Sequence, residues 1–475
     1  MVFSSLLFIF GFLPIFLTCY YAVPSRFRNI IALSGSYFFY AWGEPVFVFA
    51  LLFLSFVDYC LSRIMSGFSE EGKKGRKMVL AISLMVNIGC LLYFKYANFF
   101  MGQVNGILAE PLPWTRVALP LGISFFTFQK LSYIIDIYRG TVRPARSFIS
   151  YALYVALFPQ LIAGPIVRYH DIAQQLERRS YTIRKFTEGI WRFSIGLGKK
   201  VLIANIVGQV ADAAFSSNIS ELPILYAWLG IISYSFQIYF DFSGYSDMAI
   251  GLGWMMGFQF LENFNRPYIS RNVTEFWRRW HISLSNWMKE YLYIPLGGNR
   301  CGKIHVYLNL WIVFLISGFW HGADWTFIAW GAFHGFFLTI DRLPRPDFLK
   351  RTPVSFSRFA TFIIVTIGWV LFRSDSISQA FQYFGRMISI NSVGVYSLPE
   401  GWYNILDIRT MLTLIIAGFI SLVPDSKRLS NAVIQQPAIY NRTLSIKYAT
   451  AAVLILLSVS SLTNMDFNPF IYFRF

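Results

Sequence analysis

The stretch Met78–Leu92, which reads MVLAISLMVNIGCLL, decides the fold class of this chain. It carries no charged side chain and follows a basic segment, Lys73–Lys77. Similar apolar blocks recur along the chain between short basic connections. A membrane-spanning helix needs about 20 mostly apolar residues, and backbone groups in lipid have to be satisfied within the segment. The pattern predicts a polytopic, all-α integral membrane protein.

The composition supports this prediction. Hydrophobic residues make up 56% of the 475 residues and charged residues 14%, and the mean hydropathy is +0.50. Since an ordinary soluble domain is about 25% charged, this chain cannot cover itself with a polar surface. Val2–Val23 has neither a basic beginning nor a small-residue cleavage site, so we expect a retained first span rather than a signal peptide.

The net charge of +17 is distributed in a way that argues against nucleic acid as a partner. The cations lie in short connections: Arg26, Arg28, Arg63, Lys73, Lys74, Arg76, Lys77, Arg139, Arg143, Arg146, Arg342, Arg345, Lys350 and Arg351. This is the bias of cytoplasmic loops, and acidic membrane lipid is the expected partner. With these basic connections in the cytoplasm, the N-terminus lies outside. Met78–Phe100 then runs outward to a loop poor in charge, and Leu119–Tyr138 returns to the cytoplasmic side.

Two apolar stretches are interrupted. Gly43-Glu44-Pro45 divides Ile30–Leu61, which predicts a hairpin or two broken helices. Tyr151–Val167 contains Pro159, Gly164 and Pro165 and has basic residues on both sides. A single crossing would put one basic flank outside, so a re-entrant or membrane-buried broken helix fits better than a kinked ordinary span.

The rest of the chain extends the pattern without an internal repeat. Further helices are expected within Val201–Phe215, Pro223–Phe260, Val306–Trp320, Trp325–Ile340, Thr361–Phe372, Met411–Val423 and Ala451–Leu462. We therefore expect residues 1–475 to form a single membrane domain. Four cysteines, none at zinc-type spacing, predict neither a disulfide scaffold nor a metal site. Phosphate-binding loops, metalloprotease helices and nucleophile elbows are missing from the sequence.

His321 is the first candidate for chemistry. It lies in Ser317–Ala323 (SGFWHGA) between two apolar runs, and ionisable residues at membrane depth are costly and usually functional. Glycines beside it would let a substrate approach. A neutral imidazole in an apolar site suits general-base catalysis, although a structural, hydrogen-bonded histidine is the alternative. Asp324 could orient the ring or cap the next helix.

His281 is the second candidate, within Phe276–Leu284 (FWRRWHISL). If the segment is one helix, Trp277, His281 and Ser285 share a face. Arg278 and Arg279 could then bind the phosphates of coenzyme A entering from the cytoplasm, because arginine recognises phosphate bidentately. The alternative is an interfacial amphipathic helix with tryptophan at the headgroup level and arginine on anionic lipid.

A different class of protein also remains open. Asp241 and Asp247 lie in an apolar stretch and could form a proton relay with His321, as in a proton-coupled transporter. The missing internal repeat weakens this alternative.

Taken together, the motifs make the sequence resemble the membrane-bound O-acyltransferase (MBOAT) family, and within it the branch that acetylates exported polysaccharides. The resemblance runs nearly end to end. It rests on Phe158–Ile166 (FPQLIAGPI), Asp241–Asp247 (DFSGYSD), Asn263–Tyr268 (NFNRPY), Phe276–Leu284, Tyr293–Asn299 (YIPLGGN), Gly318–Gly322 (GFWHG) and Phe470–Phe475 (FIYFRF).

The resemblance implies a ring of transmembrane and re-entrant helices around a central tunnel, with His321 as the catalytic histidine and His281 as a second important one. It implies an O-acetyltransferase of the bacterial inner membrane that uses a cytoplasmic thioester, acetyl-CoA, as substrate and holds no bound cofactor. His321 would act as a base or form an acyl-histidine. The acceptor would be an exported polysaccharide such as alginate, reached with periplasmic partner proteins; peptidoglycan, cellulose and teichoic acid are alternatives.

Overall fold

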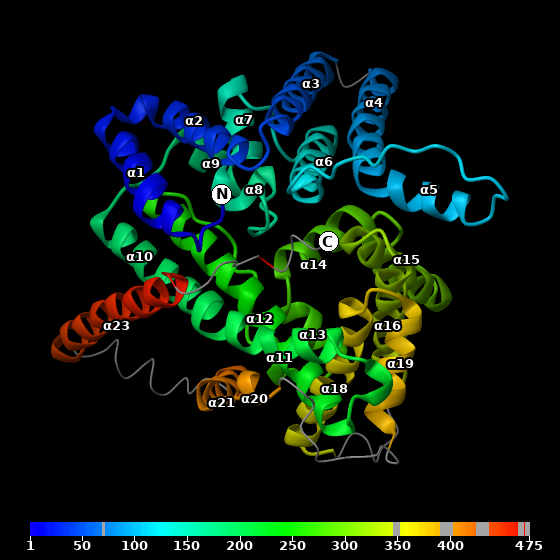
Figure 1. The fold of residues 1–475 in the computed structure, drawn as a ribbon. Coiled ribbons are helices and arrows are strands. Elements are labelled where there is room, and N and C mark those ends of the chain that lie inside the picture. Colours follow the sequence, from blue (N-terminus) through cyan, green and yellow to red (C-terminus); the bar gives the residue numbers. More distant parts are fainter. Residues whose placement is uncertain (69–71, 345–351, 390–401, 424–436, 464–469, 471–475) are drawn as a thin grey trace. The chain divides into compact units, whose positions relative to one another are not determined.

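The computed structural model describes residues 1–68, 72–344, 352–389, 402–423, 437–463 and 470. Within these ranges the secondary structure is helical and contains no strand, so the prediction of an all-α protein is confirmed. Figure 1 shows the helices in chain order. The described chain divides into two compact units, Met1–Phe193 with Ser246–Leu261, and Ser194–Tyr245 with Glu262–Phe475. A single domain with a central tunnel therefore stays a prediction.

The first unit contains the N-terminal helices. They are α1 (Leu13–Ala22), α2 (Arg28–Ala41), α3 (Phe47–Gly67), α4 (Lys73–Leu91), α5 (Ala97–Asn105), α6 (Ile123–Arg139), α7 (Phe148–Ala156), α8 (Phe158–Leu161) and α9 (Tyr169–Glu177). Residues of both units belong to α10 (Ile183–Gly198) and α12 (Ile224–Met255).

The second unit contains the segments that carry both candidate histidines. Its helices are α11 (Asn205–Ser216), α13 (Val273–Arg279), α14 (Ile282–Met288), α15 (Lys303–His321), α16 (Trp325–Arg342), α18 (Val354–Arg373), α19 (Ile377–Ile388), α20 (Trp402–Ile405), α21 (Ile408–Leu422) and α23 (Pro437–Thr463).

Five helical stretches of the described chain are long and apolar enough to cross a membrane. They are Phe47–Gly67, Lys73–Asn105, Lys303–His321, Val354–Arg373 and Ser445–Thr463. Because these spans are separated along the chain, the protein is a multi-pass membrane protein.

Both predicted interruptions are present. Helix α2 ends at Ala41 and α3 begins at Phe47, so the Gly43-Glu44-Pro45 sequence separates two helices. In the Tyr151–Val167 stretch, Leu157 leaves the helical conformation between α7 and α8. Every residue of this stretch is buried, which satisfies the condition under which broken backbone is tolerated at membrane depth. Re-entrance itself stays a prediction.

Helices α15 and α16 form a tightly packed pair in the second unit, and they lie side by side in Figure 1. A Cβ atom on Gly318 would lie 2.3 Å from the carbonyl oxygen of Phe327, and one on Gly331 would lie 2.3 Å from the carbonyl oxygen of Phe314. Real atoms cannot approach so closely, so only glycine allows these two backbones to meet. The contact fixes the end of α15, where His321 lies.

Gly331→Ala is therefore expected to destabilise the protein. The added methyl would push against backbone, and overpacking of this kind costs about 1–3 kcal/mol of unfolding free energy. Gly335→Ala, one turn later, is the matched control, because its Cβ would meet Trp311 at 3.6 Å, an ordinary contact. Thermal unfolding of the purified variants in one detergent measures both effects. Equal midpoints for the two variants would contradict the close-packing argument.

Candidate functional site

His321 is the last residue of α15, and Gly322 ends the helix in an extended conformation. The side chain is 4% exposed and is enclosed by aromatic rings. The ring centroids of Trp320, Trp330 and Phe372 lie 5.0, 5.1 and 5.3 Å from that of His321. The imidazole thus sits in an apolar, water-poor environment, as the sequence predicted.

His281 lies at a break in the chain. The backbone leaves α13 at Trp280 and re-enters a helix at Ile282, and His281 itself has a left-handed conformation with φ 44°. The prediction that Trp277, His281 and Ser285 share one helical face is therefore wrong. The break is held by a backbone hydrogen bond from Ile282 N to Asn263 O (2.9 Å), a long-range contact that local spacing cannot reveal.

Asn263 holds His281 in a defined orientation. Its Oδ1 accepts hydrogen bonds from Ser283 N (3.1 Å) and Ser283 Oγ (2.9 Å), and it lies 3.2 Å from His281 Nδ1. Since a backbone N–H can only donate, the atom facing it is the amide oxygen. His281 Nδ1 must then donate as well, which leaves the lone pair on Nε2.

Burial lowers the pKa of His281 to about 3. The ring is therefore neutral at physiological pH, with its proton on Nδ1. A general base works best when its pKa is near the working pH, so His281 is better suited to hydrogen bonding with a substrate than to accepting its proton.

The two histidines lie close together. Their ring centroids are 6.4 Å apart, so residues 40 positions apart in sequence are neighbours in the fold. Phe242 packs edge-on against His281 at 4.7 Å, and Trp320 lies 6.3 Å from it. Aromatic walls thus surround both rings.

A cavity of about 510 Å³ opens in the same unit, within the range of small-molecule sites. One wall is a stripe along α15 formed by Leu310, Val313, Phe314 and Ser317. These positions recur every three or four residues and so share one helical face. His321 is one turn beyond Ser317, the last α15 residue of the described lining, on the same face of the helix.

The side chains of three cations line this cavity: Arg278, Lys289 and Arg342. Its described lining includes no carboxylate, so the cavity is positively charged. Arg342 Nη1 donates to Asn299 Oδ1 (3.0 Å), whereas Arg278 is exposed to solvent. The structure thus brings together cations from segments that are separate in sequence. Of these three, only Arg278 was predicted from the sequence as a phosphate ligand, together with Arg279.

Arg279 faces another way. Its Nη2 and Nε lie 2.8 and 2.9 Å from Glu275 Oε1, and its Nη1 donates to the carbonyl oxygen of Asn265 (3.1 Å). It is absent from the described cavity lining. The neighbouring arginines therefore differ in their surroundings, Arg278 at the cavity and Arg279 in a helical ion pair.

Asp324 and two of the other histidines have structural partners. Asp324 caps α16 through Thr326 N (2.9 Å). His334 Nδ1 accepts from Trp277 Nε1 (3.3 Å), and His170 Nδ1 lies 2.9 Å from Asp136 Oδ2. Among the residues that the structure describes, no cluster of three His, Cys, Asp or Glu side chains could hold a metal ion.

Both buried carboxylates of the transporter alternative are ion-paired. Asp241 Oδ1 lies 2.6 Å from Lys200 Nζ, and Asp247 Oδ1 lies 2.6 Å from Arg192 Nη2 and 2.8 Å from its Nε. Each of these aspartates therefore already has a cationic partner.

Comparison with known proteins identifies the family of this chain. The profile of the membrane-bound O-acyltransferase family matches residues 143–374, which include both histidines and the cavity. The chain is 41% identical to a probable alginate O-acetylase of Azotobacter vinelandii over 100% of both chains. It is 38% identical to a peptidoglycan O-acetyltransferase of Helicobacter pylori, over 84% of this chain and 82% of that protein.

A more distant relative shares part of the chain. A teichoic acid D-alanyltransferase of Bacillus subtilis is 29% identical over 53% of this chain and 70% of its own length. The relatives above 30% identity cover most or all of the chain. The chain therefore belongs to the membrane-bound O-acyltransferase family and is an O-acyltransferase.

Proposed function

We propose that this protein transfers an acetyl group from acetyl-CoA, bound on the cytoplasmic side of the bacterial inner membrane, toward a hydroxyl of an exported polysaccharide. One observation carries the proposal: a cation-lined cavity runs along α15 and ends one helical turn from His321, which has His281 beside it. A cavity with this polarity fits a long anionic donor whose reactive end is uncharged.

The donor fits the cavity by charge. Arg278, Lys289 and Arg342 are exposed and lie in segments that the positive-inside bias assigns to the cytoplasm. Guanidinium groups bind phosphate oxygens bidentately, so these cations suit the phosphates of coenzyme A. The uncharged pantetheine arm would then follow the α15 stripe to Ser317, and the thioester carbonyl would reach the histidines.

The two histidines suit different parts of the transfer. His321 accepts the proton of the acceptor hydroxyl as its oxygen attacks the thioester carbonyl, and the protonated ring then returns a proton to the departing thiolate. His281, which is neutral and donates its Nδ1 proton to Asn263, can accept a hydrogen bond at Nε2 but does not carry the charge. The new ester bond replaces the thioester bond, and coenzyme A leaves as the free thiol.

The acceptor is proposed from the names of the relatives. A probable alginate O-acetylase covers the whole chain at 41% identity, and a peptidoglycan O-acetyltransferase covers most of it at 38%. We therefore propose an acidic exopolysaccharide such as alginate, with peptidoglycan as the second candidate. Delivery to a polymer outside the membrane implies extracytoplasmic partner proteins, which accept the acetyl group or present the polymer.

The donor assignment is tested by comparing Arg278→Gln with Arg279→Gln. Arg278→Gln is expected to raise the KM for acetyl-CoA about tenfold with little change in kcat, because a charge-assisted phosphate contact contributes about 1.5–3 kcal/mol to binding. Arg279→Gln removes the same charge one residue away but outside the cavity. The measurement is transfer of labelled acetyl groups by inside-out membrane vesicles over a range of donor concentrations.

Two outcomes would count against the donor site. If both variants have the wild-type KM, the phosphates of coenzyme A do not bind the cations that line the cavity. If both raise KM equally, the effect comes from the general charge of the cytoplasmic surface rather than from the cavity. A repeat at high salt distinguishes diffuse attraction from a close contact at the cavity, since screening weakens diffuse attraction more.

A further inference from the structure

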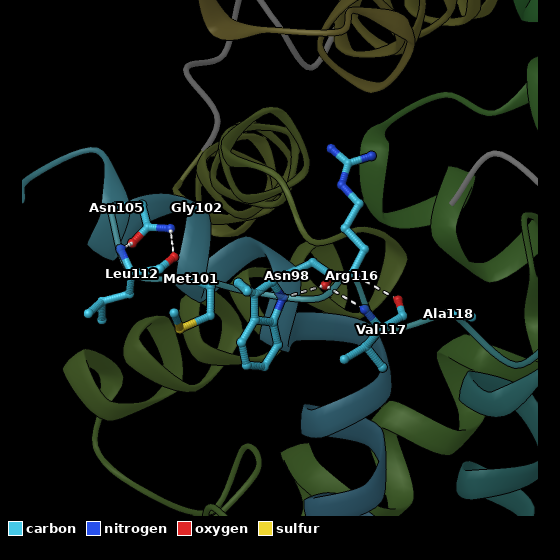
Figure 2. A pocket seen from close by; sticks show the side chains of 9 residues that line it. Asn98, Met101, Gly102, Asn105, Leu112, Arg116, Val117 and Ala118 are labelled. Atoms are coloured by element: carbon cyan, nitrogen blue, oxygen red, sulfur yellow. Dashed lines mark hydrogen bonds between the residues drawn. The ribbon is translucent and has the colours of Figure 1, made fainter. Parts of the chain in front are cut away.

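A second cavity lies in the first unit, between α5 and the loop that follows it. Figure 2 shows its lining, which includes Asn98, Met101 and Asn105 from the helix and Leu112 and Arg116 from the loop. Its volume is about 660 Å³. Nothing in the acyl-transfer chemistry uses this cavity.

Two asparagines hold the loop in place. Asn98 accepts from Trp114 Nε1 (2.9 Å) and Val117 N (3.0 Å) and donates to Val117 O (2.8 Å). Asn105 pairs with the backbone of Leu112 in both directions, at 2.9 and 3.1 Å. The dashed lines in Figure 2 mark these contacts. The cavity wall is therefore preorganised, which reduces the entropy that a ligand would lose on binding.

The orientation of the preceding span places this cavity outside the cytoplasm. Helix α4 begins in the basic segment Lys73–Lys77, which marks its cytoplasmic end. The π-helical turn Leu92–Tyr96 follows, and Figure 1 shows α5 turning away from the direction of α4 after it. Helix α5 and its loop thus lie at the opposite, extracytoplasmic end of the span, where lipid headgroups are found.

The surface around the cavity combines exposed apolar side chains with one cation. Phe100, Ile107 and Leu112 are 50%, 86% and 49% exposed, which suits contact with lipid chains at an interface. Arg116 is exposed, and Figure 2 shows its side chain extended away from the asparagine clamps. Within the described part of the chain it forms no ion pair, and Glu110 is the loop's other charged residue.

We propose that this cavity binds the headgroup of an anionic phospholipid from the outer leaflet of the membrane. Arg116 would bind the phosphate, and Trp114, whose indole N–H is fixed by Asn98, would lie at headgroup level, where tryptophan is enriched. The acyl chains would run along the exposed apolar side chains of α5 and the loop. An acidic sugar chain is less well matched, because Ile107 and Leu112 would then face water.

Gly102 offers a way to fill the cavity without disturbing the fold. It lines the cavity, and a Cβ atom added to it would meet no atom within 4 Å. Gly102→Leu should therefore occupy the headgroup space while improving helix propensity. Gly89, in α4 of the same span, also has open space around its Cβ position. Gly89→Leu is the matched control.

The test is native mass spectrometry of the purified full chain during titration with phosphatidylglycerol. Arg116→Gln and Gly102→Leu are each expected to weaken binding of the tightest lipid about tenfold, whereas Gly89→Leu should bind as wild type does. Wild-type binding by both cavity variants would overturn the proposal. Displacement of the lipid by a soluble uronate oligosaccharide, lost in Arg116→Gln, would instead identify an acidic polysaccharide as the occupant. Neither outcome depends on acyl transfer.

Discussion

Replacing His321 with alanine is expected to lower ester-linked acetate on the exported polysaccharide by about 10²–10⁴-fold, the usual contribution of a general base. The imidazole lies one turn beyond the cavity and 6.4 Å from His281, measured between ring centroids. Without it, the neighbouring His281 could not take over as the base, because its pKa is about 3. The readout is alkali-released acetate per unit of polymer at matched protein abundance.

Two control variants distinguish a loss of catalysis from a loss of packing around His321. His321→Gln keeps most of the side-chain volume among Trp320, Trp330 and Phe372 but cannot act as a base, so it should be as inactive as the alanine variant. His305→Ala removes a histidine from the first turn of the same helix, where the side chain is exposed, and should retain activity. Acetylation at the wild-type level in His321→Gln would remove His321 from the mechanism.

The helices could be predicted from the sequence because their signals are local. Apolar blocks bounded by basic residues located the spans, and Gly43-Glu44-Pro45 located a helix end. Leu157, where the buried Tyr151–Val167 stretch breaks, directly precedes the Phe158-Pro159 pair. In each case, the residues that produce the span, helix end or break lie at that position in the sequence or next to it.

The site could be predicted only in part, because its geometry depends on contacts between distant residues. The sequence indicated His321 and His281 as separate candidates, and the structure shows that their rings lie together. It gave no reason to expect a break at His281, since the stabilising partner, Asn263, lies 18 positions earlier. Arg342 was likewise assigned to a cytoplasmic loop, and only folding places it on the cavity that Arg278 lines.

Asn263 is the residue whose loss should most damage this arrangement. It is 1% exposed, and its Oδ1 serves three donors: Ser283 N, Ser283 Oγ and His281 Nδ1. Asn263→Leu has a similar size but accepts no hydrogen bond. Each buried donor left unsatisfied costs about 1–3 kcal/mol, so the variant should lose several kcal/mol of stability and most of its activity.

Asn263→Asp tests whether the hydrogen bonds accepted at this position stabilise the turn at His281. A carboxylate has the same shape and accepts the same three bonds, so this variant should unfold closer to the wild type than Asn263→Leu does. Its negative charge would also raise the pKa of His281, which should shift the pH profile of acetyl transfer while leaving the fold intact. Thermal unfolding and the pH profile are measured on both variants in the same detergent. This role of Asn263 is contradicted if Asn263→Leu has the same unfolding midpoint as Asn263→Asp and keeps wild-type activity. The left-handed turn at His281 would then be held by its flanking helices alone, and Asn263 would not orient the ring.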